Sequence, residues 1–365
     1  MTTAPSNQPL RVGVIGLGVG LAHLKAYAKM PDVQIMGLAG IEDDRRVQLG
    51  EDYNIPYLHR DYAELLAHDD IDAVSIAVPN ALHAPISLAA LNAGKHVLCE
   101  KPLARTGPEA EQIVQAAVQA KRVLQTVFNH RRRGDVEVLK RYVDQGSLGR
   151  IYHTKASWMR RRGIPSLGSW FTNKELAGGG PLIDLGVHML DMALYLLGEP
   201  TALAVSAATY AELGPRGRGA DNAGKQQVGS NYEVEDLATA FIRLADGGTL
   251  LLEASWATHG SAADDYGVTL YGTEGGGEIK VKNYSWEDTL RIYTDVADVP
   301  AEIRPEVRKV DGHLAVVRDF VQTIQSGNWS AHIGTEGLQR ARIIDACYQS
   351  AQQGREVLLS GTASS

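Results

Sequence analysis

The stretch Leu10–Gly20, LRVGVIGLGVG, decides the fold of this chain. Its first half, Leu10–Ile15, is a short apolar run rich in β-branched residues, which predicts a buried strand. A glycine-rich turn follows, and a helical pattern begins at residue 21. Glycine takes backbone conformations that a Cβ forbids, and the N–H groups at a helix start hold an anion. The stretch therefore predicts a dinucleotide site, with five cofactor contacts: Gly16, Leu17, Gly18, Val19 and Gly20.

One glycine departs from the usual spacing. A strict G-x-G-x-x-G pattern would place its third glycine at position 21, where this chain has Leu21. Gly20 comes one residue early, so we expect a shortened turn. The alternative is a tight structural turn that binds no ligand.

Downstream of this stretch, strand and helix patterns alternate. Compact apolar runs at 33–39, 71–78, 95–100 and 122–128 are separated by helical patterns, as in parallel βαβ units. They predict an α/β fold, a doubly wound parallel sheet that binds its ligand at the strands' carboxyl ends. We assign residues 1–129 to this dinucleotide-binding Rossmann domain.

The pattern changes after residue 129, where strands follow one another. After a helix at 135–145, strand patterns occur at 150–158, 201–210, 236–244, 249–256, 266–272 and 276–281. We expect residues 130–365 to form an α+β domain on a largely antiparallel open sheet, for substrate binding and oligomerisation. The polar segment 211–232 predicts a surface loop, and the end of the chain predicts helices at 313–326 and 335–353.

Composition excludes several classes of protein. The chain has 365 residues, 44% of them hydrophobic, which is typical of a globular protein of about two domains. A net charge of −7 argues against binding nucleic acid. Apolar runs are too short for a membrane span, and the N-terminal stretch has no secretory pattern. With only two cysteines, the sequence predicts a cytoplasmic protein without disulfides.

The residues after the second strand bear on cofactor choice. Glu42 stands about where an acidic residue takes the adenosine ribose hydroxyls, which favours NAD. Arg45 and Arg46 leave NADP open, because they could meet a 2′-phosphate or could be solvated helix charges. NAD is the predicted cofactor, and NADP is not excluded.

Two further motifs give a specific family resemblance. Glu100-Lys101-Pro102 follows the run at 95–100, and the stretch 178–188, GGGPLIDLGVH, leads into a helix. With the glycine turn, these motifs resemble the Gfo/Idh/MocA oxidoreductases, named for glucose–fructose oxidoreductase and inositol dehydrogenase. Val78-Pro79-Asn80 and Leu148-Gly149-Arg150 extend the resemblance over nearly the whole chain.

The resemblance implies roles for individual residues. Lys101 matches a lysine near the nicotinamide and the substrate hydroxyl, and Asp184 and His188 match a pair that supplies a sugar contact and the acid/base group. Gly40 stands where many relatives have a ribose-binding aspartate. The cofactor contacts implied beside the glycine turn and Glu42 are Pro79, Asn80, His83, Glu100, Lys101 and Trp170.

The chemistry of these residue types agrees with the roles that the resemblance implies. Oxidising a secondary alcohol needs a base at the hydroxyl and a nicotinamide facing the carbon. His188 suits the base because its ordinary pKa is near neutrality, and Lys101 would polarise the oxygen. Asp184 lies four residues before His188, so on an α-helix the two would share one face. Asp191 either orients the imidazole or satisfies a backbone group.

Basic and aromatic residues suggest further substrate contacts. Arginines cluster at 131–133 and 160–162, and guanidinium groups suit anionic sugars, although both clusters could instead be solvated or bridge subunits. Trp158 and Trp170 either stack on a ring or belong to the core. No metal site is predicted, since the histidines show no ligand spacing. The predicted substrate contacts are Lys101, Asn129, Arg131, Arg161, Asp184 and His188.

We therefore predict an NAD(P)-dependent dehydrogenase of a sugar, sugar derivative or cyclitol, with a small carbohydrate as its partner and no membrane. An alternative is redox-neutral glycoside cleavage, in which a borrowed hydride gives a transient 3-keto sugar. That chemistry needs another base, for which Tyr232 and Tyr266 are candidates. A non-catalytic dinucleotide sensor is a third possibility. By the family likeness we expect a homodimer or homotetramer.

Overall fold

The chain forms two compact units in the computed structural model, which describes residues 8–220 and 231–359. Unit 1 comprises Met1–Asn129 and Asp311–Ala341, and unit 2 comprises His130–Val310 and Arg342–Ser365. The sequence assigned everything after residue 129 to a second domain. The structure instead returns Asp311–Ala341 to unit 1, because an amphipathic helix in this segment packs into the core of that unit.

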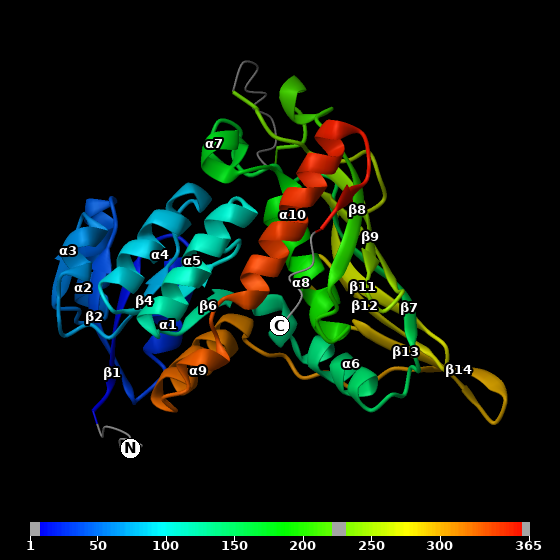
Figure 1. The fold of residues 1–365 in the computed structure, drawn as a ribbon, viewed down its shortest axis with the longest axis horizontal. Coiled ribbons are helices and arrows are strands. Elements are labelled where there is room, and N and C mark those ends of the chain that lie inside the picture. The colour runs from blue at the N-terminus through cyan, green and yellow to red at the C-terminus, as the bar shows by residue number, and fades with distance from the viewer. Residues whose placement is uncertain (1–7, 221–230, 360–365) are drawn as a thin grey trace. The chain divides into compact units, whose positions relative to one another are not determined.

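Unit 1 is built on a six-stranded sheet in the order β3-β2-β1-β4-β5-β6 (Figure 1). Every strand pairing in it is parallel, which confirms the predicted doubly wound sheet. Its strands are β1 (Leu10–Ile15), β2 (Val33–Ala39), β3 (Tyr57–His59), β4 (Ala73–Ile76), β5 (His96–Glu100) and β6 (Leu124–Val127). Its helices are α1 (Gly20–Tyr27), α2 (Asp43–Asp52), α3 (Tyr62–Leu66), α4 (His83–Asn92), α5 (Gly107–Ala120) and α9 (Gly312–Gln325).

Helices cover both faces of this sheet. Val97 and Cys99 of β5 face a cluster formed with α3, α4 and α5, whereas Leu98 faces a cluster formed with α1, α2 and α9. Alternating side chains point to opposite faces of a strand, so a strand covered on both sides must be apolar throughout. This explains why the strands of unit 1 appear in the sequence as continuous apolar runs.

Unit 2 contains a nine-stranded sheet in the order β14-β13-β12-β11-β7-β10-β9-β8-β15. β7 and β10 pair in parallel, and the other neighbours are antiparallel, as predicted. The strands are β7 (Ile151–Arg160), β8 (Ala202–Tyr210), β9 (Leu237–Leu244), β10 (Thr249–Ser255), β11 (Asp264–Gly272), β12 (Gly276–Lys282), β13 (Leu290–Val296), β14 (Val299–Ile303) and β15 (Val357–Leu358).

Helices cover one face of this second sheet. They are α6 (Gly134–Asp144), α7 (Lys174–Ala177), α8 (Val187–Leu196) and the later part of α10 (Thr335–Gln353), preceded at α8 by a π-helix, η4 (Leu182–Gly186). α8 is almost wholly buried, since nine of its ten residues are buried. Short 3₁₀ turns complete the described elements: η1 (Asn80–Leu82), η2 (Asn129–Arg132), η3 (Trp170–Thr172), η5 (Gly214–Arg216) and η6 (Trp329–Ala331).

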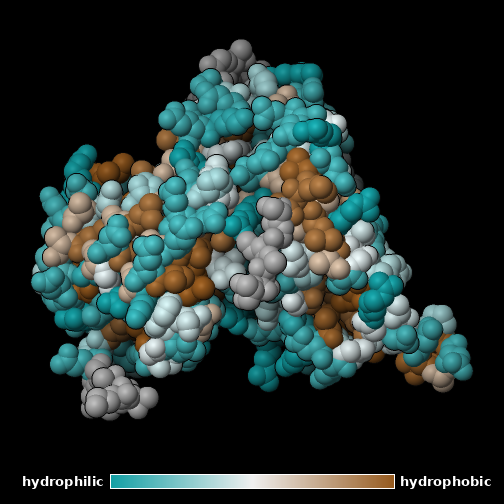
Figure 2. Space-filling view, viewed as in Figure 1, coloured by the Kyte–Doolittle hydropathy of each residue, from teal (hydrophilic) through white to brown (hydrophobic). Residues whose placement is uncertain are grey.

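Four strands fall outside every predicted range: β3, β13, β14 and β15. β3 and β15 have three and two residues, too few to show a pattern. The β13–β14 hairpin turns at Ala297 and Asp298, which have φ of 52° and 62° without a glycine to signal the turn. Its flanking Val296 and Val299 are exposed, and Figure 2 shows apolar residues near the end of this hairpin.

Two other expectations concern segments outside the sheets. The predicted loop 211–232 contains η5, and its residues 221–230 lie outside the described part of the chain. Among residues 8–220 and 231–359, the structure has no helix with both the length and the apolar character needed to cross a membrane.

We predict that Phe320→Ala destabilises unit 1. Phe320 on α9 is fully buried among residues of α1 and the sheet, so truncation removes packing and leaves a cavity. Such changes cost about 3–5 kcal/mol, measurable by urea denaturation followed by circular dichroism. Val118→Ala on α5 is the control, because Val118 is 42% exposed. Equal stability of the two variants would contradict the placement of α9 in this core.

Candidate functional site

Gly16 directly follows β1 and begins the glycine turn. It has φ of +95°, and a Cβ there would lie 2.1 Å from the Ala77 carbonyl oxygen. Its N–H donates to the Ala39 carbonyl at 2.8 Å, so its backbone is fixed between two neighbouring strands. Only glycine fits this position, because its backbone conformation and the neighbouring carbonyl leave no room for a Cβ.

Gly18 and Gly20 serve two different purposes. A Cβ at Gly18 would meet no atom of the described residues within 4 Å, so the space beside it is open to a ligand. A Cβ at Gly20 would lie 3.1 Å from Val14 Cγ1, because α1 begins there and packs closely on β1. Close helix–strand packing is the role of the third glycine in a dinucleotide-binding turn. The turn is therefore one residue shorter, and Gly20 replaces the glycine expected at position 21.

The residues after β2 explain why Gly40 replaces an aspartate. A Cβ at Gly40 would lie 2.6 Å from Cγ of the buried Leu17, so the glycine turn itself occupies that space. Glu42 is exposed at the start of α2. The Arg46 guanidinium donates to the Gly40 carbonyl and to Asp43, and this pairing with a carboxylate disfavours a second anion beside it.

The loop after β4 contains the predicted residues Pro79, Asn80 and His83. The His83 ring lies 2.6 Å from the Pro102 carbonyl through Nδ1 and 2.9 Å from the Val78 carbonyl through Nε2. Burial lowers the pKa of His83, although both carbonyl contacts oppose this. His83 thus connects its loop to the turn that contains Lys101, while direct contact of these residues with a cofactor stays a prediction.

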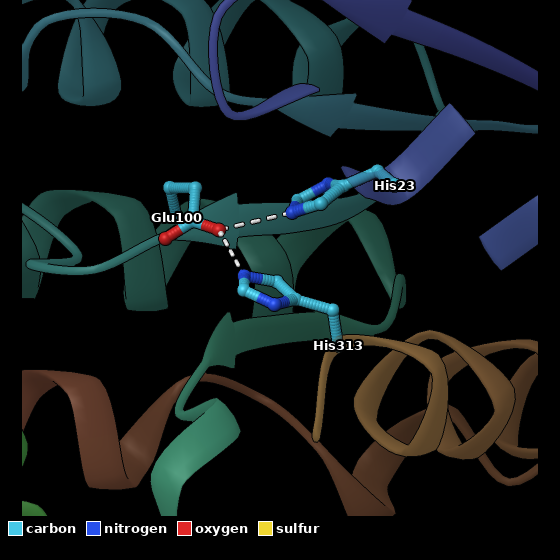
Figure 3. Close-up of side chains that lie close together, drawn as sticks. All are labelled: His23, Glu100 and His313. Carbon is cyan, nitrogen blue, oxygen red and sulfur yellow. Dashed lines mark hydrogen bonds and ion pairs between the residues drawn. The ribbon is translucent and has the colours of Figure 1, made fainter. Parts of the chain in front are cut away.

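Glu100, at the end of β5, lies between two histidines that sequence reasoning missed (Figure 3). Its Oε1 is 3.0 Å from His23 Nε2 and 3.7 Å from His313 Nε2. Burial alone would raise the pKa of Glu100, but the contacts with His23 and His313 outweigh it and hold that pKa well below its usual range.

These three side chains are close enough to hold a metal ion, which the sequence did not predict. The distances equally suit a carboxylate accepting hydrogen bonds, and Glu100 Oε2 also accepts the Lys101 N–H at 3.1 Å. His23 lies 77 residues before Glu100, so no local spacing could reveal the group. The arrangement fixes the backbone at the point where Lys101 leaves β5.

In unit 2, a buried carboxylate fixes the glycine run before Asp184. Glu235 accepts the Gly180 N–H at 2.9 Å, the Leu182 N–H at 3.1 Å and the Tyr348 hydroxyl at 2.9 Å. Burial raises the pKa of Glu235, and these donors oppose the rise. A Cβ at Gly180 would lie 2.1 Å from the Glu235 carbonyl oxygen, so the close approach requires glycine.

Asp184 lies within the π-helix that precedes α8. The buried Trp256 donates its indole N–H to Asp184 Oδ2 at 2.9 Å. The expectation of one regular α-helix through Asp184 and His188 is therefore wrong, because π-type turns replace α-type turns before Val187. Such π segments are often found at functional sites.

His188 lies in the first turn of the buried helix α8 and is 7% exposed. Its ring centroid lies 4.6 Å from that of His130 and 5.7 Å from that of Trp158. Trp158 is itself 3% exposed, and it donates its indole N–H to Asp264 at 2.7 Å. Of the two interpretations of Trp158, the core position is the observed one.

Several predicted contacts are engaged with other protein groups. Arg131 forms a two-pronged ion pair with the buried Asp191, through Nε and Nη2. Asn129 Nδ2 lies 3.4 Å from His313 Nδ1, and the Trp170 ring stacks on Phe171 with centroids 3.8 Å apart. Asp191 thus pairs with a guanidinium, and substrate or cofactor contacts of Asn129, Arg131 and Trp170 stay predictions.

Of the two tyrosines considered as additional bases, Tyr266 is buried and Tyr232 is partly buried. Tyr266 accepts a hydrogen bond from Arg133 at 2.9 Å, and burial raises its pKa to about 12. Tyr232 donates to the Glu235 carbonyl at 3.1 Å, and burial raises its pKa further above the usual value. Phenols with raised pKa values stay protonated at neutral pH, so neither is suited to remove a proton.

Gly16 and Gly18 generate a matched pair of predictions. We expect Gly16→Ala to lower the thermal midpoint of the unliganded protein, because the Cβ would collide with a backbone carbonyl. We expect Gly18→Ala to leave that midpoint unchanged and to weaken NADH binding about tenfold or more, because the Cβ fills the space for the pyrophosphate. Thermal unfolding and calorimetric titration measure the two effects. Unchanged NADH affinity in Gly18→Ala would contradict this placement.

Comparisons with known proteins agree over both units. Residues 10–128 match the family model described as "Oxidoreductase family, NAD-binding Rossmann fold". Residues 140–359 match that described as "Oxidoreductase family, C-terminal alpha/beta domain". Both models are those of the Gfo/Idh/MocA family, so the predicted resemblance is confirmed.

Individual relatives match along nearly their whole length. D-glucoside 3-dehydrogenase of Escherichia coli (strain K12) is 33% identical over 362 residues, 98% of this chain and 100% of the relative. Levoglucosan dehydrogenase of Pseudarthrobacter phenanthrenivorans is 32% identical over 388 residues, 94% of this chain and 96% of the relative.

A solved structure has the same fold. Levoglucosan dehydrogenase in complex with NADH and levoglucosan superposes with a TM-score of 0.84 at 30% identity, covering 97% of this chain and 100% of that one. With both family models matched in order along one chain, this protein belongs to the Gfo/Idh/MocA oxidoreductase family.

Proposed function

We propose that this protein is an NAD-dependent dehydrogenase that oxidises a secondary hydroxyl of a sugar, sugar derivative or cyclitol. The observation that carries the proposal is that a chain of this NAD-binding family retains Lys101, Asp184 and His188 together. A dinucleotide sensor would need none of the three. The named relatives act on a glucoside and on levoglucosan, which supports a carbohydrate substrate.

The proposed chemistry divides among these three side chains. His188 takes the proton from the substrate hydroxyl, and Lys101 donates a hydrogen bond to that oxygen. Asp184, oriented by Trp256, accepts a hydrogen bond from a neighbouring hydroxyl and so holds the sugar ring. NAD, when bound, supplies the hydride acceptor.

NAD is favoured over NADP by the charges after β2. Glu42 is exposed and available to accept hydrogen bonds from ribose hydroxyls. Arg46, one of the two cations that could meet a 2′-phosphate, is instead paired with Asp43. The five turn residues and Pro79, Asn80, His83, Glu100 and Trp170 are the remaining proposed cofactor contacts, with Asn129, Arg131 and Arg161 as further substrate contacts.

We further propose that the protein forms a homodimer or homotetramer and that it is located in the reducing cytoplasm. One face of the nine-stranded sheet carries the helices, and its other face presents half-exposed side chains such as Leu251, Phe241 and Met159. A second copy of the chain would cover them. Cys99 and Cys347 are both buried free thiols, in keeping with that compartment.

The first experiment measures absorbance at about 340 nm, where NADH and NADPH absorb, with NAD and then NADP as the cofactor. The substrates tested are free sugars, inositols, acidic sugars and glycosides. We expect a rise with NAD for at least one carbohydrate. No rise with any substrate, together with release of an aglycone, would favour glycoside cleavage through a borrowed hydride. No turnover of either kind would favour a sensor. The raised pKa values of Tyr232 and Tyr266 disfavour the cleavage reaction.

We predict that His188→Ala lowers kcat by about 10²–10⁴-fold, the usual contribution of a general base. Lys101→Ala has an effect of the same order, and in both variants the affinity for NADH changes less than about twofold, because binding of the dinucleotide rests on the glycine turn. His153→Ala is the control, since the His153 ring on β7 bonds Thr249 and stacks on Tyr271 and has no role in the proposed reaction. Wild-type kcat in either active-site variant would refute its assigned role.

A further inference from the structure

Unit 2 contains a cavity that the reaction above does not use. Its volume is about 640 Å³, and it lies at the end of β7, where the chain leaves the sheet. Its polar lining includes Arg160, Arg162, Asp264 and Tyr284, beside the small apolar residues Ala220 and Ala263. Hydrogen-bonding groups interspersed with small apolar surfaces suit a polyhydroxylated ligand rather than an apolar one.

One buried residue, Trp158, lies between the cavity wall and the side chains assigned to the sugar. The His188 ring lies 5.7 Å from Trp158, and Trp158 lies 6.1 Å from Tyr284 in the cavity wall. Asp184 also acts on this wall electrostatically. Burial would lower the pKa of Arg160, but Tyr284, Asp264 and Asp184 raise it, so the Asp184 carboxylate lies within electrostatic range. The proposed base, His188, is thus linked to the cavity wall by two successive ring contacts, through Trp158 to Tyr284.

Charge in the cavity favours an anion. Arg160 Nε lies 3.0 Å from Asp264 Oδ2, and Arg160 Nη2 donates to the Tyr284 hydroxyl at 2.8 Å, so its charge is matched within the protein. Arg162 makes no ion pair or hydrogen bond with any residue in 8–220 or 231–359 through its guanidinium. Arg162 is an exposed residue of the lining, and its charge is not neutralised by any carboxylate of the described residues, although the whole chain has a net charge of −7.

Three residues with strained backbone conformations line the same cavity. Ser166, Asn283 and Tyr284 have φ of 32°, 47° and 59°, and all three line the cavity. Non-glycine residues in this region of backbone space are strained and persist where the surrounding structure enforces them, often at ligand sites. Three strained residues at one cavity are an observation independent of its charge.

We propose that this cavity is a second subsite, which binds the glycosidic substituent of the oxidised sugar and selects substituents that carry a carboxylate. The proposal rests on the proposed dehydrogenase function. The sugar ring lies at Asp184 and His188, and its substituent extends past Trp158 into the cavity. There a carboxylate pairs with Arg162, while neutral hydroxyls bond Asn283 and Tyr284.

The test compares disaccharides with their aldobionic acids. Maltose and cellobiose are assayed beside maltobionate and cellobionate, so that each pair keeps one linkage and differs in the carboxylate-bearing end. We expect kcat/KM for the acid to exceed that for its parent at least fivefold. In Arg162→Ala this ratio falls to about one. In Arg150→Ala, whose exposed arginine stands at the other end of β7, the ratio is kept.

A binding measurement separates this proposal from the dehydrogenase function. Calorimetric titration with maltobionate needs no turnover, and we expect binding that Arg162→Ala weakens at least fivefold and Arg150→Ala does not. Equal binding of maltose and maltobionate, or a preference that survives Arg162→Ala, overturns the subsite. Selective binding of the acid with no oxidation of any carbohydrate supports the subsite and overturns the dehydrogenase.

Discussion

The arrangement of the stretch that contains Asp184 and His188 depends on one buried carboxylate, that of Glu235. It accepts the N–H groups of Gly180 and Leu182 at the start of the π-helix and the hydroxyl of Tyr348 from α10. A negative charge at a helix start is favourable because the backbone N–H groups there have no helical partner. The glycine run therefore serves packing rather than flexibility, since a Cβ at Gly179 or Gly180 would collide with Tyr348 or Glu235. Asp184 and His188 follow directly from this fixed point.

The fold was predictable wherever burial imposes a pattern on the sequence. Strands covered on both faces must be apolar throughout, so β1, β2, β4, β5 and β6 were found at nearly their observed bounds. β3 was missed because three residues cannot show a pattern, and the β13–β14 hairpin because its turn uses Ala297 and Asp298. The place of α9 in unit 1 could not be predicted, since an amphipathic pattern shows that a helix is covered but not by which core.

The residues of the candidate site were likewise predictable only in part. Residues within a continuous motif, such as the glycine turn and the stretch 178–188, could be found because their function requires a fixed local spacing. Their supporting partners could not, since Trp256 lies 72 residues from Asp184, and Glu235 lies 55 from Gly180. Charge was the least predictable property. The two arginine clusters look alike in sequence, yet Arg131 is neutralised by Asp191 while Arg162 is left without a carboxylate in the described chain.

The helix α10 has a consequence for how this chain can be divided. Its residues up to Ala341 belong to unit 1 and those from Arg342 to unit 2, so the backbone passes between the units three times, after positions 129, 310 and 341. Neither unit is a continuous segment of sequence. A fragment cut at residue 129 would retain the nucleotide-binding sheet but would expose the face of it that Val317 and Phe320 cover. Recombination that exchanges a whole unit of this protein therefore needs two segments from each parent. A single crossover after residue 129 would pack α9 of one parent against the sheet of the other.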